Sequence, residues 1–172
     1  MMASFKCDGI IVGAGFGGMY QLKKLLDQDL SVVLIDAASD VGGAWLWNQY
    51  PGAASDIESH LYRYLWDKED LLRYPWEYHY VKQLEVLSYL RHVNRPDLRK
   101  HMHFNTKMIS ATFVEKRNIW EVKTSGNVTF EARHVVTALS LLAKQNFPRI
   151  PGLYEGAFKG ELLPHRKLAK IA

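Results

Sequence analysis

Three glycines near the amino terminus have the spacing of a turn that binds a diphosphate. Gly13, Gly15 and Gly18 satisfy the pattern Gly-x-Gly-x-x-Gly, directly after the apolar run Gly9–Val12. In such a turn the first glycine permits a tight bend, the second lets the backbone approach a pyrophosphate, and the third lets the next helix pack closely. The helix amino terminus then offers free N–H groups to the anion. The motif therefore predicts a dinucleotide-binding turn.

An acidic residue stands where a ribose-binding carboxylate is expected. Asp36 lies 23 residues beyond Gly13, at the end of a second apolar run, Ser31–Ile35. Between them, leucines recur at helical spacing, so the order is strand, glycine turn, helix and strand, with a right-handed crossover. A carboxylate here accepts a hydrogen bond from the adenosine ribose of either NAD or FAD and repels a 2′-phosphate.

The rest of the chain predicts a glycine-rich loop, a helix and a β-meander. Leu84, Leu87 and Leu90 recur at helical spacing and are expected on one helix face. A meander favours FAD over NAD, because a simple NAD domain would carry another crossover helix there. The expected elements are a loop with short helical turns at 37–60, a helix at 81–93, a third parallel strand at 104–106, three antiparallel strands at 109–115, 119–124 and 128–131, and a buried strand at 134–138.

The composition is that of an ordinary folded domain. The chain has 172 residues, of which 48% are hydrophobic and 23% charged, enough for one domain with a sizeable core. A single cysteine excludes a disulfide-stapled scaffold and fits a reducing compartment. The net charge of +4 comes from basic residues spread along the chain and does not favour a nucleic-acid partner. With no signal peptide or membrane span in the sequence, we expect a cytoplasmic protein without a membrane partner.

Other reactive side chains do not form a recognisable site. His101 and His103 have strand spacing, but no further Cys or His completes a cluster, so we expect no metal. Cys7 begins the first apolar run and is expected to be a buried, inert thiol. The aromatic-rich stretch 45–80 is expected to fill a core and line a pocket instead of stacking on nucleic-acid bases.

The run GAGFGG, followed by LIDAASDVGGAWLWNQYPGAASDIES, resembles the amino-terminal part of the Baeyer–Villiger monooxygenases. These class B flavin-dependent enzymes hold FAD and use NADPH and dioxygen. The resemblance extends from about Cys7 to Leu162 and implies an α/β, Rossmann-like FAD-binding three-layer fold with an antiparallel β-meander. It implies a partial FAD-binding domain at 1–150, then a linker and a divergent basic tail at 151–172, where the NADPH domain would begin.

The resemblance also implies an activity and a set of site residues. The activity is insertion of one oxygen of dioxygen next to a ketone carbonyl, or oxygenation of a heteroatom. Asp56 matches the family's active-site aspartate, which works with an arginine from a later part of the enzyme. The implied cofactor contacts are Gly13, Gly15, Phe16 and Gly18 for the diphosphate, Asp36 for the ribose, Gly43, Trp45 and Tyr62 towards the flavin, and Met108 near the adenine.

The sequence departs from the family at several positions. Ala44 replaces a threonine, Leu139-Ser140 replaces Thr-Gly, and Pro164 takes the place of a signature histidine, with His165 following it. No second Gly-x-Gly-x-x-Gly is present for NADPH. We therefore expect a chain that is truncated relative to the family, either naturally or through an error in the gene model, with a partner chain or longer reading frame supplying the rest. A non-catalytic FAD-binding remnant and an NAD-binding domain are the alternatives.

Overall fold

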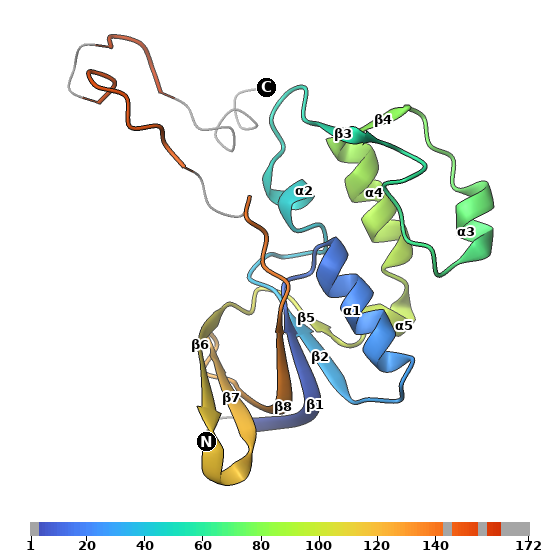
Figure 1. Cartoon of the computed structure of the whole chain (residues 1–172), viewed down its shortest axis with the longest axis vertical. Coiled ribbons are helices and arrows are strands. Elements are labelled where there is room, and N and C mark those ends of the chain that lie inside the picture. Colours follow the sequence, from blue (N-terminus) through green and yellow to red (C-terminus); the bar gives the residue numbers. More distant parts are fainter. Residues whose placement is uncertain (1–3, 143–145, 155–157, 163–172) are drawn as a thin grey trace.

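A six-stranded sheet forms the centre of the computed structural model, which describes residues 4–142, 146–154 and 158–162 (Figure 1). The strand order is β5-β2-β1-β8-β7-β6. In this order β5, β2 and β1 form one half of the sheet, and β8, β7 and β6 form the meander. The strands are β1 (Ser4–Val12), β2 (Val32–Ile35), β5 (Met102–His103), β6 (Met108–Val114), β7 (Ile119–Thr124) and β8 (Thr129–Thr137).

The amino-terminal unit confirms the predicted strand, glycine turn, helix and strand. Helix α1 (Phe16–Leu26) connects β1 to β2, and these two strands pair in parallel. β1 also pairs in parallel with β8 over its whole length, from Ser4 opposite Thr129 to Val12 opposite Thr137. The first strand is therefore longer than the apolar run Gly9–Val12 suggested, because β8 supplies a partner for its polar amino-terminal half.

The antiparallel meander is confirmed, although its last strand differs from the prediction. Strands β6, β7 and β8 pair antiparallel in sequence order. The separate strands expected at 128–131 and 134–138 are one continuous strand, β8. Arg133 and His134 divide the apolar pattern of the sequence, but both side chains are exposed and the backbone pairing with β1 continues past them.

The expected third parallel strand at 104–106 is also wrong by two residues. The strand is β5, which pairs with Leu34 and Ile35 of β2. Beyond it the chain turns, because Asn105 has a left-handed backbone with φ of 53°. Its N–H donates to Ala38 O, and the N–H of Thr106 donates to Asp36 O. Residues 104–106 therefore anchor the loop after β2 instead of extending the sheet.

The middle of the chain forms a second unit of structure beside α1 (Figure 1). The expected loop at 37–60 contains a short helix, as predicted, and also a strand that was not predicted. This strand, β3 (Ala54–Glu58), pairs antiparallel with β4 (Tyr80–Lys82). The elements are α2 (Ala44–Trp47), β3 (Ala54–Glu58), α3 (Lys68–Arg73), β4 (Tyr80–Lys82), α4 (Gln83–Val93) and α5 (Pro96–Arg99), and a 3₁₀ turn (Glu115–Arg117) later joins β6 to β7.

Helix α4 starts two residues later than predicted and buries a different face. Leu87 and Leu90 are buried as expected, but Leu84 is 74% exposed. Gln83 is buried in its place. The helix therefore faces inwards through Gln83, Val86, Leu87, Tyr89, Leu90 and Val93.

The parallel strands lie between two apolar layers, which confirms the three-layer prediction. Ile11 and Leu34 pack with Met19 and Leu22 of α1. Alternate residues of the same strands face the other way and pack against the meander, as period-two strands require. This second layer joins Ile10, Val12 and Ile35 to Val122, Phe130 and Ala132.

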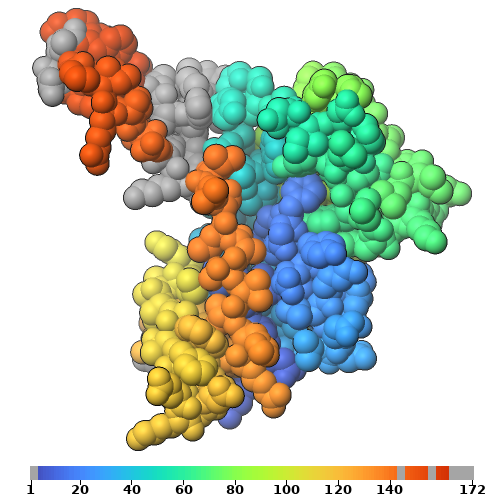
Figure 2. Space-filling view, in the orientation of Figure 1, coloured from blue at the N-terminus to red at the C-terminus, as the bar shows by residue number. Residues whose placement is uncertain are grey.

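The described residues after β8 contain no helix or strand. In Figure 2 they extend away from the sheet, coloured orange to red. The domain boundary near Pro151 therefore stays a prediction. Gly156, Pro164, His165 and the basic tail lie outside the described residues. Within the described ranges, no helix is long and apolar enough to cross a membrane.

Candidate dinucleotide-binding site

A cavity of about 1780 Å³ lies at the carboxyl ends of β1 and β2. Ligands of open α/β sheets bind at this edge. The cavity exceeds the roughly 300–1,000 Å³ of a drug-sized pocket, so it has room for a ligand larger than a drug. Its walls contain every predicted cofactor residue except Gly18, namely Gly13, Gly15, Phe16, Asp36, Gly43, Trp45, Asp56, Tyr62 and Met108.

The glycine turn has the geometry that its sequence predicts. Gly13 has φ of 113°, a conformation that L side chains rarely adopt. A Cβ on Gly13 would also lie 2.6 Å from the carbonyl oxygen of Ala138. Gly18 stands behind the turn, where a Cβ would lie 1.8 Å from the carbonyl oxygen of Gly13. The third glycine therefore sets how closely α1 approaches β1.

The amino terminus of α1 is open to an anion. The helix begins after Gly15, no side chain caps it, and its first turn contains no acidic residue. Its first intrahelical bond runs from Met19 N to Gly15 O at 3.0 Å. The N–H groups before Met19 lack intrahelical partners because they belong to the first turn. Such groups, together with the helix dipole, bind phosphates.

The loop before α2 touches the glycine turn through backbone atoms at two glycines. A Cβ on Gly43 would lie 2.9 Å from the Cα of Gly15. Gly42 donates its N–H to Ala14 O at 3.0 Å. The backbones of the two loops therefore meet at these glycines, where a ligand can contact both.

Asp36 is held at one end of the cavity by two backbone amides. Its Oδ2 accepts from Ala14 N at 2.6 Å, and its Oδ1 accepts from Ala38 N at 2.8 Å. The carboxylate therefore ties the glycine turn to the loop after β2. Each carboxylate oxygen can accept a further hydrogen bond, such as one from a ligand hydroxyl.

Two aromatic side chains form a polar contact further along the cavity. The indole Nε1 of Trp45 donates to the hydroxyl oxygen of Tyr62 at 2.9 Å. The Tyr62 ring also packs edge-on against Phe16, with centroids 4.9 Å apart. Burial raises the pKa of Tyr62, the Trp45 hydrogen bond opposes that rise, and the nearby Asp56 adds to it. Tyr62 therefore stays a neutral phenol, whose pKa the exposed carboxylate of Asp56 in β3 helps to raise.

Buried tyrosines connect the glycine turn to α4, a feature that the sequence pattern did not single out. Tyr64 donates its hydroxyl to Phe16 O at 2.8 Å, and its own N–H donates to the hydroxyl of Tyr89 at 2.8 Å. Tyr64 also stacks on Trp66, with centroids 3.8 Å apart. These contacts confirm that the aromatic-rich stretch fills a core. No sequence signal distinguishes Tyr64 from its many aromatic neighbours.

The buried phenols predict alkaline destabilisation. Burial raises the pKa of Tyr64, and burial raises the pKa of Tyr89 to about 12. An unfolded tyrosine titrates near pH 10, so between about pH 10 and 12 the unfolded state binds fewer protons than the folded state. The free energy of unfolding should therefore be unaffected by these groups below pH 10 and fall above it. Urea titrations at pH 9, 10 and 11 measure this, and equal midpoints at all three would contradict it.

The positions that depart from the resemblance also line the cavity. Ala44 is the first residue of α2, and Leu139 and Ser140 follow β8. Lys107 and Thr106 join the wall beside Met108, the half-buried first residue of β6. The bulkier pair Leu139-Ser140 therefore stands in the wall of the predicted site, next to the contact of Ala138 with Gly13.

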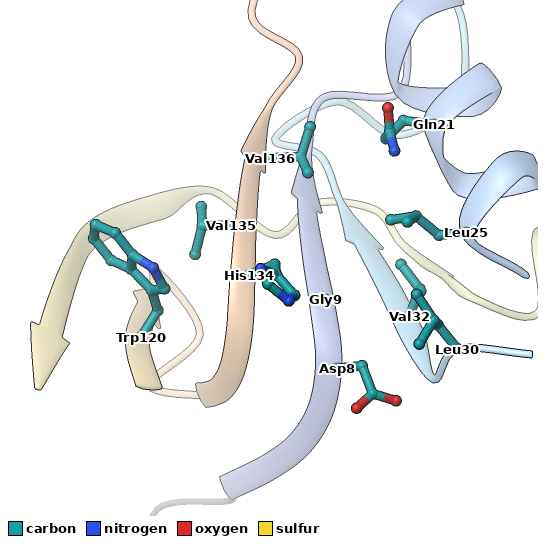
Figure 3. Close-up of a pocket in the computed structure, with 10 residues that line it drawn as sticks. All are labelled: Asp8, Gly9, Gln21, Leu25, Leu30, Val32, Trp120, His134, Val135 and Val136. Carbon is teal, nitrogen blue, oxygen red and sulfur yellow. The ribbon is translucent and has the colours of Figure 1, made fainter. Parts of the chain in front are cut away.

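Other candidate groups lie outside this cavity. A second cavity of about 460 Å³ lies beside α1 and is mainly apolar, with Leu25, Val32 and Val136 in its wall (Figure 3). Cys7 is half-buried, and burial together with Asp8 raises its pKa to about 11, so its thiol is a poor nucleophile. Within the described ranges, His, Cys, Asp and Glu side chains form no cluster of three suited to a metal.

Comparison with known proteins agrees with this geometry. A family model described as an NAD(P)-binding Rossmann-like domain matches residues 11–74. A Baeyer–Villiger monooxygenase of Pseudooceanicola batsensis is 45% identical over 158 residues, covering 91% of this chain and 29% of that protein. A cyclohexanone 1,2-monooxygenase of Acinetobacter sp. is 46% identical over 157 residues, covering 90% of this chain and 28% of that protein. The chain thus spans less than a third of the length of these curated relatives.

Solved structures show the same likeness in three dimensions. A cyclohexanone monooxygenase from Rhodococcus sp. Phi1, crystallised with NADP+, superposes with a TM-score of 0.82 at 45% identity. The match covers 92% of this chain and 30% of that one. An oxidised steroid monooxygenase bound to NADP superposes with a TM-score of 0.80 at 40% identity. The Rossmann-like fold of the chain is therefore that of the corresponding part of these enzymes.

Proposed function

We propose that this chain, which resembles the amino-terminal part of Baeyer–Villiger monooxygenases over nine-tenths of its length, binds FAD and serves a monooxygenase reaction. The observation that carries the proposal is one continuous cavity that joins three features. These are the carboxylate of Asp36, the uncapped amino terminus of α1 and the Trp45–Tyr62 pair. An FAD molecule needs a partner for its ribose, its diphosphate and its ring system, and these features supply the three in that order.

Each part of the site has a binding role that follows from its chemistry. The first-turn N–H groups of α1, behind Gly15, would hold the diphosphate. Asp36 would accept from the adenosine ribose, and Met108 would contact the adenine. Gly43 would let the loop before α2 pack directly against the glycine turn, because a side chain there would collide with Gly15, and the cofactor would then contact the backbone of both loops.

The flavin end of the cavity is formed by Trp45, Tyr62 and Asp56. When bound, the flavin would supply the redox chemistry, with NADPH as reductant and dioxygen as the oxygen source. Trp45 and Tyr62 would orient the ring and exclude water. Asp56, at an exposed position of β3, would hold or move a proton near the reacting atoms. The substrate class proposed from the relatives' names is a ketone, with a heteroatom as the alternative, in a cytoplasmic enzyme.

Direct binding of FAD tests the proposal. The purified chain should quench the fluorescence of added FAD and carry flavin absorbance through gel filtration, with a dissociation constant in the micromolar range or below. The stability gain should grow with ligand concentration as mass action requires. A chain that carries no flavin and gains no stability with FAD would contradict the proposal.

An NAD-binding domain is the second candidate, favoured by the family model over residues 11–74. It predicts a colourless protein whose midpoint of thermal unfolding rises with NADH and not with FAD. The same titration with NADH in place of FAD separates the two. Consumption of NADPH with a ketone, measured with the flavin-loaded chain, separates an active enzyme from a non-catalytic FAD-binding remnant.

A further inference from the structure

Gln83 is a buried polar residue at the start of α4, outside the predicted cofactor set. The residue is 6% exposed. The amide Nε2 donates to the backbone oxygen of Trp45 at 2.5 Å, and the backbone N–H of Gln83 donates to Ala53 O at 2.9 Å. Because Trp45 O can only accept, the side-chain amide must present its N–H₂ group to it. One residue therefore holds two separate segments of the cavity wall.

The two segments that Gln83 holds carry the flavin end of the site. Trp45 lies in α2, and Ala53 directly precedes β3, the strand that carries Asp56. Helix α2 has four residues and none of them is buried, so it cannot fix its own position. Helix α4 has eleven residues and six of them are buried, so its own position is fixed by core packing. The hydrogen bond of Gln83 transfers the rigidity of α4 to α2.

A second contact supports α4 as the base of this wall. A Cβ on Gly42 would lie 2.7 Å from Cδ1 of Leu87, so the loop before α2 rests directly on α4. Leu84, beside Gln83, is exposed. The sequence thus places a polar residue inwards and an apolar one outwards at the start of α4. Such a reversal of the usual pattern needs a buried partner for the polar group, and Trp45 O is that partner.

From this arrangement we infer that Gln83 is a positioning residue, which fixes α2 so that the Trp45 indole keeps its hydrogen bond to Tyr62 and faces the flavin. The inference rests on the proposed FAD binding. Gln83 touches no cofactor itself, since it does not line the cavity. It acts through Trp45.

The first test compares two glutamine variants of the full chain. Gln83→Met keeps the length of the side chain but removes the donor, and should weaken FAD binding about ten-fold, as expected for one buried hydrogen bond. Flavin fluorescence should also be quenched less in the complex, because the Trp45 ring no longer packs in one orientation. Gln28→Met is the matched control, since Gln28 is exposed and its side-chain amide donates to the backbone oxygen of its neighbour Asp27. It should bind FAD as the parent chain does.

The second test asks whether the effect passes through the Trp45 side chain. In a double-mutant cycle, adding Gln83→Met to Trp45→Phe should cost less than three-fold, because the side chain that Gln83 positions is already gone. Full additivity would overturn the inference, as would unchanged FAD affinity and quenching in Gln83→Met. If Gln83→Met fails to fold, Gln83→Glu serves in its place, since it sets an oxygen against Trp45 O and should weaken binding at least ten-fold. Failure of the parent chain to bind FAD would instead overturn the proposed function.

Discussion

Gly18→Ala is expected to destabilise the chain by about 3 kcal/mol or more and to abolish FAD binding. Its Cβ would lie 1.8 Å from the carbonyl oxygen of Gly13, and the backbone of the βαβ unit fixes the positions of both atoms. No side-chain rotation can relieve the contact, so α1 must move away from β1. Overpacking in a core costs about 1–3 kcal/mol, and here the neighbour is backbone. Chemical denaturation measures the loss, and FAD fluorescence measures binding.

Gly17→Ala is the matched control for this variant. Gly17 precedes Gly18 in the same helix turn, but a Cβ there meets no atom within 4 Å. Alanine in a helix is favoured over glycine by about 0.5–1 kcal/mol, so this variant should be at least as stable as the parent chain. Equal denaturation midpoints for the two variants would contradict the packing role assigned to Gly18.

Asp36→Ala is expected to weaken FAD binding about 100-fold and to lower stability by about 3 kcal/mol or more. The carboxylate accepts hydrogen bonds from Ala14 N and Ala38 N, and each bond to a charged group contributes about 1.5–3 kcal/mol. Its loss releases the glycine turn from the loop after β2 and removes the proposed ribose partner. Isothermal titration with FAD gives the affinity, and urea denaturation without FAD gives the stability.

Asp8→Ala separates the two effects of Asp36→Ala. Asp8 also accepts a hydrogen bond across the same pair of strands, from Ser31 N at 3.0 Å. It lies in β1 towards the amino-terminal side of Gly9, outside the wall of the large cavity. Its loss should lower stability modestly and leave FAD affinity within about two-fold. If Asp8→Ala weakened FAD binding as much as Asp36→Ala, the ribose role of Asp36 would be wrong.

The glycine turn could be predicted from sequence because its requirements are local. Gly13 needs a backbone conformation that other residues avoid. Gly18 must leave room for the carbonyl oxygen of Gly13, which is only five residues earlier. Both requirements are therefore visible in the sequence as glycines at a fixed spacing. The meander could likewise be predicted, since the turn residues between its strands are local signals.

The parts that sequence reasoning missed depend on distant partners. Strand β3 has no alternating pattern of its own and exists because β4 pairs with it. Arg133 and His134 broke the apolar pattern of β8, yet β1 holds the strand in one piece. Gln83 has the composition of a surface residue, and only its bond to Trp45, 38 residues earlier, explains its burial. In these three cases tertiary contacts decide strand pairing and burial, and they override the local sequence pattern.

The pairing of β1 with β8 sets an order in which this chain can fold during its synthesis. Ser4 pairs opposite Thr129 and Val12 opposite Thr137. One long edge of β1 therefore stays unpaired until β8, the last strand of the sheet, has been synthesised. At about 5–20 residues per second, a ribosome takes roughly 6–25 s to make the intervening chain. During that time β1 has only β2 beside it. A nascent chain should therefore stay sensitive to protease until β8 has left the ribosome, and then become resistant in one step.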